Sequence, residues 1–340
     1  MPGKLVLIVL VVATVGVGGY YYANFETNWH YGEDGSLQRI EIVPRAARSE
    51  AETDAPSPAD PPRPLPATAK STIRIATFNL GGLDDVKLGN QMVGNVLARV
   101  ITQFDVVAVQ NIRADNRGVL AKLIERINAA GGNFDYAICP SVVSDPVGQH
   151  GAFLFNKASV VVDRSTVQSV GDPGKRFRHR PLVGSFRAVG PKQSEAFTFT
   201  LVNVHNEPEN AEEELDLLDD VYRKVRNDGR NEDDVILLGD FGSDGIELGQ
   251  LMDLPDMAPS IIRTPTTTRG TRLADNILFN RRSTVEFTGM SGVLDLMRVC
   301  DLTIQEAMGV SDHLPVWAEF SRYEGGQPGY AALGSGRITR

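Results

Sequence analysis

The sequence predicts one α/β (α+β) domain over residues 71–322, and three observations favour it. Stretches typical of strands and of helices alternate along this block. Hydrophobic residues make up 42% of the 340-residue chain, which is enough to fill the core of a domain of this size. Polar residues of the kinds used in catalysis stand at the ends of the apolar strands. The segments on either side differ in composition and are expected to lie outside the domain.

The N-terminal segment 1–25 contains an uncharged run that is followed by three tyrosines. The run extends from Leu5 to Gly19, and with the tyrosines it approaches the length of about 20 residues that spans a bilayer. We therefore expect a transmembrane anchor, with a cleaved signal peptide headed by Lys4 as the alternative. Because Lys4 precedes the run and acidic residues follow it, the domain is expected on the extracytoplasmic side, or secreted or periplasmic after cleavage.

Three further segments are expected to stay outside the domain. Residues 26–44 form a short juxtamembrane segment, in which the glycines near position 32 predict a hairpin over 28–44. Residues 45–70 are rich in Pro and Ala, a composition typical of an extended linker. The tail 323–340 is rich in glycine and is expected to be disordered.

The apolar runs of the domain predict strands that alternate with helices. The helices are expected at about 87–101, 117–129 and 210–226. In the last of these, Asn210 and Glu213 have the spacing of a capping box, and the apolar residues after them recur on one face. The expected strands are Ile73–Asn79, Asp105–Gln110, Gly151–Phe155, Phe197–His205, Val235–Gly239, Asn276–Phe279 and Leu314–Phe320.

The charge and the cysteines limit the classes of function. The net charge of −9 gives the chain as a whole no attraction to nucleic acid or to an anionic membrane, so a nucleic-acid substrate would need a local basic patch. The segment 175–180 is such a patch. The two cysteines, Cys139 and Cys300, do not make a disulfide framework. Two buried thiols are the favoured interpretation, and a single bridge is the alternative.

Five polar sites stand where apolar strands begin or end. They are Asn79, His205, Asp240, Asp275 and the pair Asp312–His313. A single Asp or His at such a place usually caps a turn or faces solvent. Five sites in register with strand ends are better explained by one shared site, because strand ends hold side chains in fixed geometry.

The same residues stand in segments that resemble the motifs of the endonuclease/exonuclease/phosphatase superfamily, the group that shares its fold with pancreatic deoxyribonuclease. The resemblance covers about residues 71–322, with the motifs in the family's order. It implies a four-layer α/β/β/α sandwich of two mixed β-sheets flanked by helices, and hydrolysis of a phosphate ester. The segments are Ala76-Thr-Phe-Asn79-Leu, Asp105-Val-Val-Ala-Val-Gln-Asn111, Val204-His205-Asn206, Leu238-Gly-Asp240-Phe-Gly242, Asp275-Asn-Ile and Ser311-Asp312-His313-Leu-Pro-Val.

The resemblance also implies four catalytic residues. His313, oriented by Asp275, would act on the attacking water or hold the scissile phosphate, since a carboxylate fixes the tautomer of a histidine and stabilises its imidazolium form. Asp240 would position or deprotonate the water, or serve the leaving oxygen. His205 would hydrogen-bond a phosphate oxygen or protonate the leaving group.

Other positions are implied as binding residues. Asn79 and Arg180 would contact the phosphate of the substrate. Asn79, Asn111 and Asp312 would hold Mg²⁺ or Mn²⁺, which neutralises charge on the phosphate. The substrate class stays open between nucleic acid, a nucleotide and a lipid head group, and the membrane would be a partner through the N-terminal helix.

Three positions depart from the family pattern. Asn111 stands where the family has the Glu that is its main metal ligand, so the cation is expected to be weakly bound. Gly242 replaces an Asn, and no acid stands near Gln149–His150, where the family has a carboxylate. Two interpretations follow: a divalent-metal-dependent phosphoesterase or nuclease with an altered metal site, or a pseudoenzyme that binds a phosphate-bearing ligand or a protein at the cell envelope.

Overall fold

The chain divides into two compact units, Met1–Pro66 and Ala67–Arg340. In the first unit, β1 (Phe25–Tyr31) pairs antiparallel with β2 (Leu37–Pro44), close to the hairpin expected from the sequence. The computed structural model describes these two strands and residues 71–113, 118–139, 149–243 and 248–327. The expected anchor, linker and most of the glycine-rich tail lie outside the described residues. Within them, no helix is both long enough and apolar enough to cross a bilayer.

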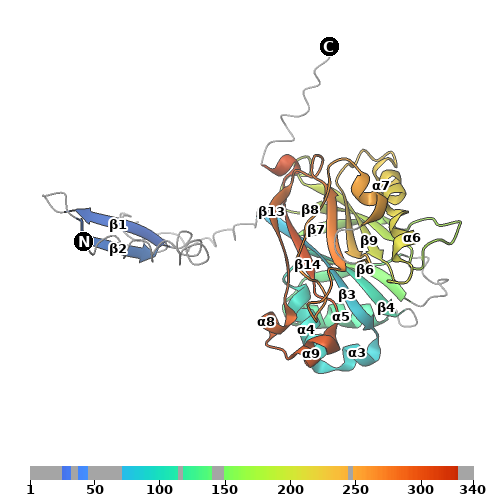
Figure 1. Cartoon of the computed structure of the whole chain (residues 1–340), viewed down its shortest axis with the longest axis horizontal. Coiled ribbons are helices and arrows are strands. Elements are labelled where there is room, and N and C mark those ends of the chain that lie inside the picture. Colours follow the sequence, from blue (N-terminus) through green and yellow to red (C-terminus); the bar gives the residue numbers. More distant parts are fainter. Residues whose placement is uncertain are drawn as a thin grey trace, which may run out of the picture. The chain divides into compact units, whose positions relative to one another are not determined.

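Two mixed six-stranded sheets form the centre of the second unit (Figure 1). One has the strand order β13-β14-β3-β4-β6-β5, and the other has the order β11-β12-β10-β9-β8-β7. The pairs β3–β4 and β9–β10 run parallel, whereas the other neighbours run antiparallel. The strands are β3 (Thr72–Leu83), β4 (Val106–Arg113), β5 (Phe134–Ala137), β6 (Gln149–Asn156), β7 (Val160–Ser169), β8 (Leu182–Ala188), β9 (Thr198–His205), β10 (Val235–Asp240), β11 (Met257–Pro259), β12 (Asp275–Asn280), β13 (Phe287–Val293) and β14 (Val316–Ser321).

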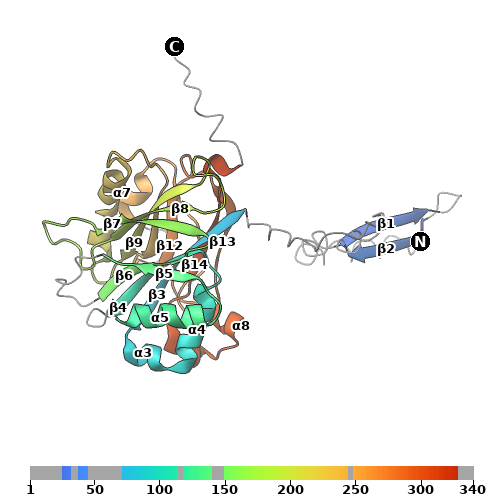
Figure 2. The ribbon, with the colours of Figure 1, turned by 180° about the vertical axis from the view of Figure 1, so that it is seen from behind.

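Helices cover the outer face of each sheet, which confirms the predicted four-layer sandwich (Figure 2). One outer layer contains α3 (Asp85–Gly89), α4 (Gln91–Ile101), α5 (Gly118–Ala129), α8 (Leu296–Cys300) and α9 (Ile304–Val310). The other contains α6 (Ala211–Leu215), α7 (Leu218–Arg226) and the 3₁₀ turn η3 (Gly249–Asp253). A second 3₁₀ turn, η4 (Glu324–Gly326), follows β14.

The central strands are apolar on both faces because each sheet is buried on both sides. In β3, Ile73 and Ile75 pack into the core between the sheets, whereas Phe78 and Leu80 pack under the helices. Leu237 and Leu238 of β10 likewise belong to opposite cores. Packing on two faces fixes the direction of these strands, so their ends can carry side chains in constant positions.

Three details of the expected helices are wrong. The stretch 87–101 is divided into α3 and α4 by Asn90, which has an extended backbone. The stretch 210–226 breaks into α6 and α7 near Asp216, and Asn210 forms no capping hydrogen bond with its side chain. A residue whose side chain caps a helix normally has an extended backbone. Asn210 has φ −117° and ψ 0°, which is not extended, and this explains the missing hydrogen bond. Thr303 and Glu306 form a true capping box at the start of α9.

Cys139 and Cys300 form no disulfide with each other, so the alternative of a single bridge is wrong. Cys139 is buried in the core between the sheets, and Cys300 is partly exposed at the end of α8. This agrees with the interpretation of Cys139 as a small buried apolar residue.

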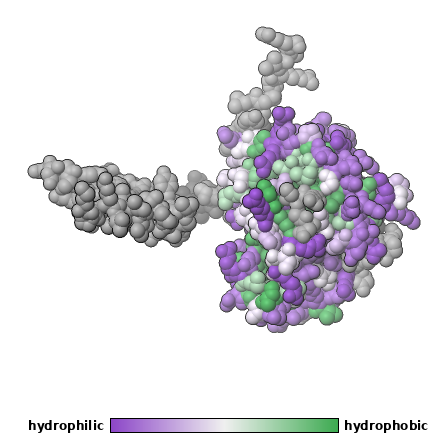
Figure 3. Space-filling view, in the orientation of Figure 1, coloured by the Kyte–Doolittle hydropathy of each residue, from purple (hydrophilic) through white to green (hydrophobic). Residues whose placement is uncertain are grey.

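Hydrophilic residues cover most of the domain face drawn in Figure 3, and apolar residues form small patches there. The large exposed apolar side chains belong to Val86, Val161, Ile262, Val285 and Met290, which are scattered along the chain. Single exposed apolar residues are ordinary on soluble proteins. The drawn face therefore offers no broad apolar surface for a lipid or a partner.

Candidate active site

The ends of three neighbouring strands bring His205, Asp240 and Asp275 together. His205 ends β9 and Asp240 ends the parallel strand β10, and the two residues are paired in register. Asp275 begins β12, which runs antiparallel to β10 and places Asp275 opposite Asp240. The carboxyl ends of parallel strands meet at one edge of a sheet, which explains this convergence.

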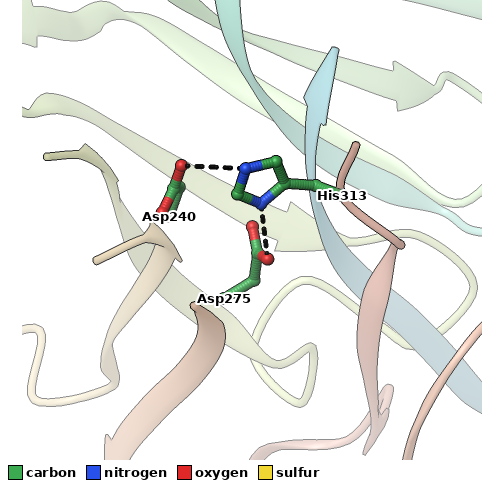
Figure 4. A group of neighbouring side chains, drawn as sticks. All are labelled: Asp240, Asp275 and His313. Carbon is green, nitrogen blue, oxygen red and sulfur yellow. Dashed lines mark hydrogen bonds and ion pairs between the residues drawn. The ribbon is translucent and has the colours of Figure 1, made fainter. Parts of the chain in front are cut away.

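His313 enters the site from the loop before β14 of the other sheet and lies between two carboxylates (Figure 4). Its Nδ1 is 2.8 Å from Oδ2 of Asp275, and its Nε2 is 3.5 Å from Oδ2 of Asp240. Asp275 is fully buried, and its Oδ2 also accepts a hydrogen bond of 2.8 Å from Thr266. Burial by itself lowers the pKa of His313, but Asp275, Asp240 and Asp312 together raise it to about 10. His313 is therefore an imidazolium at neutral pH.

Asp240 is held by two donors. Asn79 Nδ2 donates to its Oδ2 at 2.8 Å, and the backbone N–H of Gly242 donates to its Oδ1 at 3.0 Å. Burial, and after it the charge of Asp275, raise the pKa of Asp240 to about 6. Asp240 is therefore a carboxylate at neutral pH, but one that takes up a proton more readily than an exposed Asp.

The segment that contains Ser311 and His313 is hydrogen-bonded to the strand that carries Asn79. Ser311 Oγ donates to the carbonyl oxygen of Asn79 at 2.7 Å, and the backbone N–H of His313 donates to Ser311 Oγ at 3.0 Å. These bonds fix His313 relative to the strand that carries Asn79. Asp312 is exposed beside them.

His205 faces a second histidine that the sequence reasoning missed. The rings of His205 and His179 stack with centroids 4.5 Å apart and an interplanar angle of 14°, and Nε2 of His179 lies 3.1 Å from Oε1 of Glu207. Burial, and then the neighbouring His179 and His313, lower the pKa of His205 to about 3. His205 is therefore a neutral imidazole at ordinary pH.

The residue expected to contact phosphate in this loop was Arg180, but the structure brings His179 to the site. Arg180 is partly exposed, and no ion pair joins it to the described part of the chain. His179 is 6% exposed and lies one position before it. The sequence shows only that the segment 175–180 is basic, and this does not indicate which of its side chains points into the site.

Gly242, one of the departures from the family pattern, is required by its surroundings. Its φ is +65°, and a Cβ at this position would lie 2.7 Å from the backbone oxygen of Asn206. An Asn side chain therefore does not fit this backbone without a shift. The position contributes its N–H to Asp240 in place of a side-chain amide.

The set of predicted metal ligands, Asn79, Asn111 and Asp312, lies around Gly81 and Gly82. A Cβ on Gly81 would lie 3.5 Å from Oδ1 of Asp312, and one on Gly82 would lie 3.9 Å from Oδ1 of Asn111. Oδ1 of Asn111 is buried without a partner, as an unfilled ligand position would be. The third predicted ligand is Asn79, whose Oδ1 already accepts a hydrogen bond from the backbone N–H of Gly81.

This set contains a single carboxylate, and a cation of the chain lies beside it. The Lys87 ammonium donates to the carbonyl oxygens of Leu80 and Gly81 at 2.7 and 2.8 Å, and a Cβ on Gly81 would lie 3.0 Å from Nζ. One carboxylate next to an ammonium fits only a weakly held divalent cation. Ligand atoms of Asp240, Asp275 and His313 also lie within 4.8 Å of one another, but His313 can bind an ion only as a neutral imidazole.

We expect Asn111→Asp to tighten divalent-cation binding by at least about tenfold, because it adds a second carboxylate to the set. Asn111 has φ +59°, a left-handed conformation that Asp tolerates as Asn does. Titration of the chain with Mn²⁺, followed by calorimetry, measures the change. The exposed Asn227→Asp is the matched control. Equal affinities in all three proteins would place any bound cation away from Asn111.

Comparisons with known proteins agree with the fold. No protein-family model matches the sequence. The chain is 26% identical over 271 residues to deoxyribonuclease-1 of Gallus gallus, covering 72% of this chain and 91% of that protein. It is 28% identical over 274 residues to deoxyribonuclease-1-like 2 of Mus musculus, covering 74% of this chain and 93% of that protein.

Among solved structures, the fold is similar to D. rerio TDP2 complexed with a single-strand DNA product. The TM-score is 0.53 with 16% identity, over 74% of this chain and 99% of that chain. At such low identity this likeness shows the fold alone. The chain is thus similar in sequence to deoxyribonucleases, and its fold is a deoxyribonuclease I-like α/β sandwich.

Proposed function

We propose that the chain hydrolyses a phosphate ester with His313, Asp240 and His205. The observation that carries this proposal is the placement of His313 between Asp275 and Asp240, with nitrogen–oxygen distances of 2.8 and 3.5 Å. An imidazolium and a carboxylate that stand side by side form the acid and the base of one reaction. The similarity to deoxyribonucleases supports the same reaction class.

The charges of the groups assign their roles. Asp240 is ionised and accepts the proton of the attacking water, whose oxygen forms the new bond to phosphorus. The bond between phosphorus and the leaving oxygen breaks, and the His313 imidazolium donates a proton to that oxygen. His205 is neutral, so it cannot serve as the acid at pH 7, and it hydrogen-bonds a phosphate oxygen instead. Asp275 keeps His313 protonated and oriented. A divalent cation held by Asn79, Asn111 and Asp312 would neutralise charge on the phosphate.

A nucleic-acid phosphodiester is the substrate that we propose first. The relatives are deoxyribonucleases, and the basic residues Lys175, Arg176 and Arg178 are exposed directly before His179. Cations at this place can contact phosphates that flank the scissile bond, although Arg178 is also 3.4 Å from Glu207. The uncharged N-terminal run would hold this activity at a membrane, on its extracytoplasmic side.

Incubation of the full chain with duplex DNA, with and without Mg²⁺ or Mn²⁺, tests the proposal. Nicked or shortened product is expected, with turnover that falls as salt rises, because phosphate contacts are screened. Binding of DNA without product in every condition would instead support a pseudoenzyme, which the missing carboxylate at Asn111 makes the second candidate. Turnover of a nucleotide or a lipid phosphodiester but not of DNA would keep the reaction and change the substrate.

We expect a bell-shaped pH–activity profile that rises near pH 6 and falls near pH 10. Below about pH 6 Asp240 gains a proton and loses its function as a base, and above about pH 10 His313 loses the proton that it donates. Initial rates measured from pH 4.5 to 10.5, with stability checked at each pH, give the profile. A rate that still rises with pH above 10 would contradict the role of His313 as the acid.

A further inference from the structure

A second group of acids lies at the other end of the strands that carry the active site. Asp234 stands directly before β10, whereas Asp240 ends that strand. At about 3.3 Å per residue, β10 separates the two ends by about 20 Å. Glu286 stands directly before β13, and Glu324 follows β14 in η4. Ligand oxygens of Asp234, Glu286 and Glu324 lie within 4.8 Å of one another.

Two members of this group are buried, Glu324 is partly exposed, and no cationic side chain of the described residues pairs with them. Asp234 is 1% exposed and Glu286 is 2% exposed. Glu286 Oε1 accepts a hydrogen bond of 2.6 Å from the N–H of Gly325, and Glu324 Oε2 accepts one of 3.2 Å from the N–H of Thr198. No Lys, Arg or His in the described part of the chain forms an ion pair with any of the three acids.

Three buried oxygens in this group have no hydrogen-bond partner of normal geometry. They are Oδ1 of Asp234, Oε2 of Glu286 and the hydroxyl oxygen of Thr284, which is 1% exposed. The Thr284 hydroxyl lies beside Asp234 but does not form a hydrogen bond of normal geometry with it. Buried polar atoms without partners are rare in native proteins and call for an occupant such as an ion.

Buried carboxylates that have neither an ion pair nor a full set of hydrogen bonds are costly. A cation compensates the charges and satisfies the oxygens at the same time.

We propose that Asp234, Glu286 and Glu324, with the hydroxyl of Thr284, bind one Ca²⁺ ion. Oxygen ligands lie about 2.3–2.6 Å from Ca²⁺, so two of them can be up to about 5 Å apart, which agrees with the separation of these carboxylates. Mg²⁺ requires about 2.0–2.1 Å and therefore a tighter group. The ion links the strand β10 of one sheet to segments beside β13 and β14 of the other, and it stabilises the domain independently of the proposed hydrolysis.

Thermal unfolding of the full chain in EDTA and in 1 mM Ca²⁺ tests this site, and calorimetry gives the stoichiometry. We expect Ca²⁺ to raise the midpoint by about 5 °C or more, Mg²⁺ to raise it less, and one ion to bind. Asp234→Asn should abolish the shift and melt no lower than the wild type in EDTA, because it removes a buried charge. Glu324→Gln is a partly exposed second variant that should weaken the shift if Asp234→Asn fails to fold.

Two control variants separate this site from other acids. The exposed Glu209→Gln should keep the full Ca²⁺ shift, and Asp240→Asn should keep it as well, because Asp240 belongs to the active site at the opposite strand end. Equal midpoints of the wild type in EDTA and in Ca²⁺ would overturn the proposal and leave protonated carboxyls as the explanation. Loss of the shift in Asp240→Asn with its retention in Asp234→Asn would assign the ion to the active site instead.

Discussion

Asp240→Asn is expected to lower kcat by about 10³-fold or more while leaving the fold intact. The change removes the group that accepts the proton of the attacking water, and general-base catalysis contributes about 10²–10⁴-fold to such reactions. The Asn side chain has the same shape, and its oxygen can still accept the hydrogen bond from Gly242. Because burial already raises the pKa of Asp240, a neutral side chain should not lower the melting temperature.

The rate of ester cleavage and the melting temperature are the two measurements for this variant. Asp253→Asn is the matched control, since Asp253 is exposed and lies in η3. We expect the control to keep wild-type activity. If Asp240→Asn retained more than about a tenth of the activity, the base would have to be another group. An enzyme that has lost its general base does not keep a rate close to that of the wild type.

Three residues of the candidate site, His205, Asp240 and Asp275, were predictable because each lies at the end of a buried strand. An apolar run followed by a polar residue fixes where the strand stops, and packing on both faces of the sheet fixes the direction of the last side chain. Asp240 and His205 therefore meet in register, and His313 reaches Asp275 from the other sheet. His205 also lies close enough to His313 for the two side chains to interact electrostatically.

His179 was not predictable, because it lies in a loop between β7 and β8 where no periodicity marks which side chain points inward. The choice of Arg180 rested on charge, which favours the exposed residue. The break between α6 and α7 was not predictable for a related reason. Leu215 and Leu218 continue the helical spacing across Asp216, so the pattern of apolar residues does not reveal it.

The left-handed backbone of Asn111 and the acid group around Asp234 could not be predicted from the sequence, for a different reason. A positive φ at a non-glycine residue depends on the bulge where β4 leaves its register with β6, which is a tertiary feature. Asp234, Glu286 and Glu324 span about ninety positions, and each has the appearance of an ordinary surface acid in the sequence. Only the fold brings them together.

Asp275→Asn is expected to reduce kcat by roughly 10²–10⁴-fold and to move the alkaline limb of the pH profile downward. Asp275 is the strongest of the charges that raise the pKa of His313 to about 10, so without it the imidazolium should lose its proton at a lower pH. The oxygen of Asn can still accept the bonds from His313 Nδ1 and from Thr266 at the position of Oδ2, so the variant removes the charge and keeps the contacts.

The shift of the pH profile separates this role from a merely structural one. A variant that is less stable but keeps the charge should lose activity without moving the alkaline limb, and Thr266→Val serves as that comparison because it removes a hydrogen bond to Asp275 and leaves the carboxylate. Rates from pH 6 to 10.5 for both variants, each checked for folding, decide between them. An alkaline limb that stays near pH 10 in Asp275→Asn would mean that Asp240 alone holds the proton on His313, and that the buried pair is a packing feature.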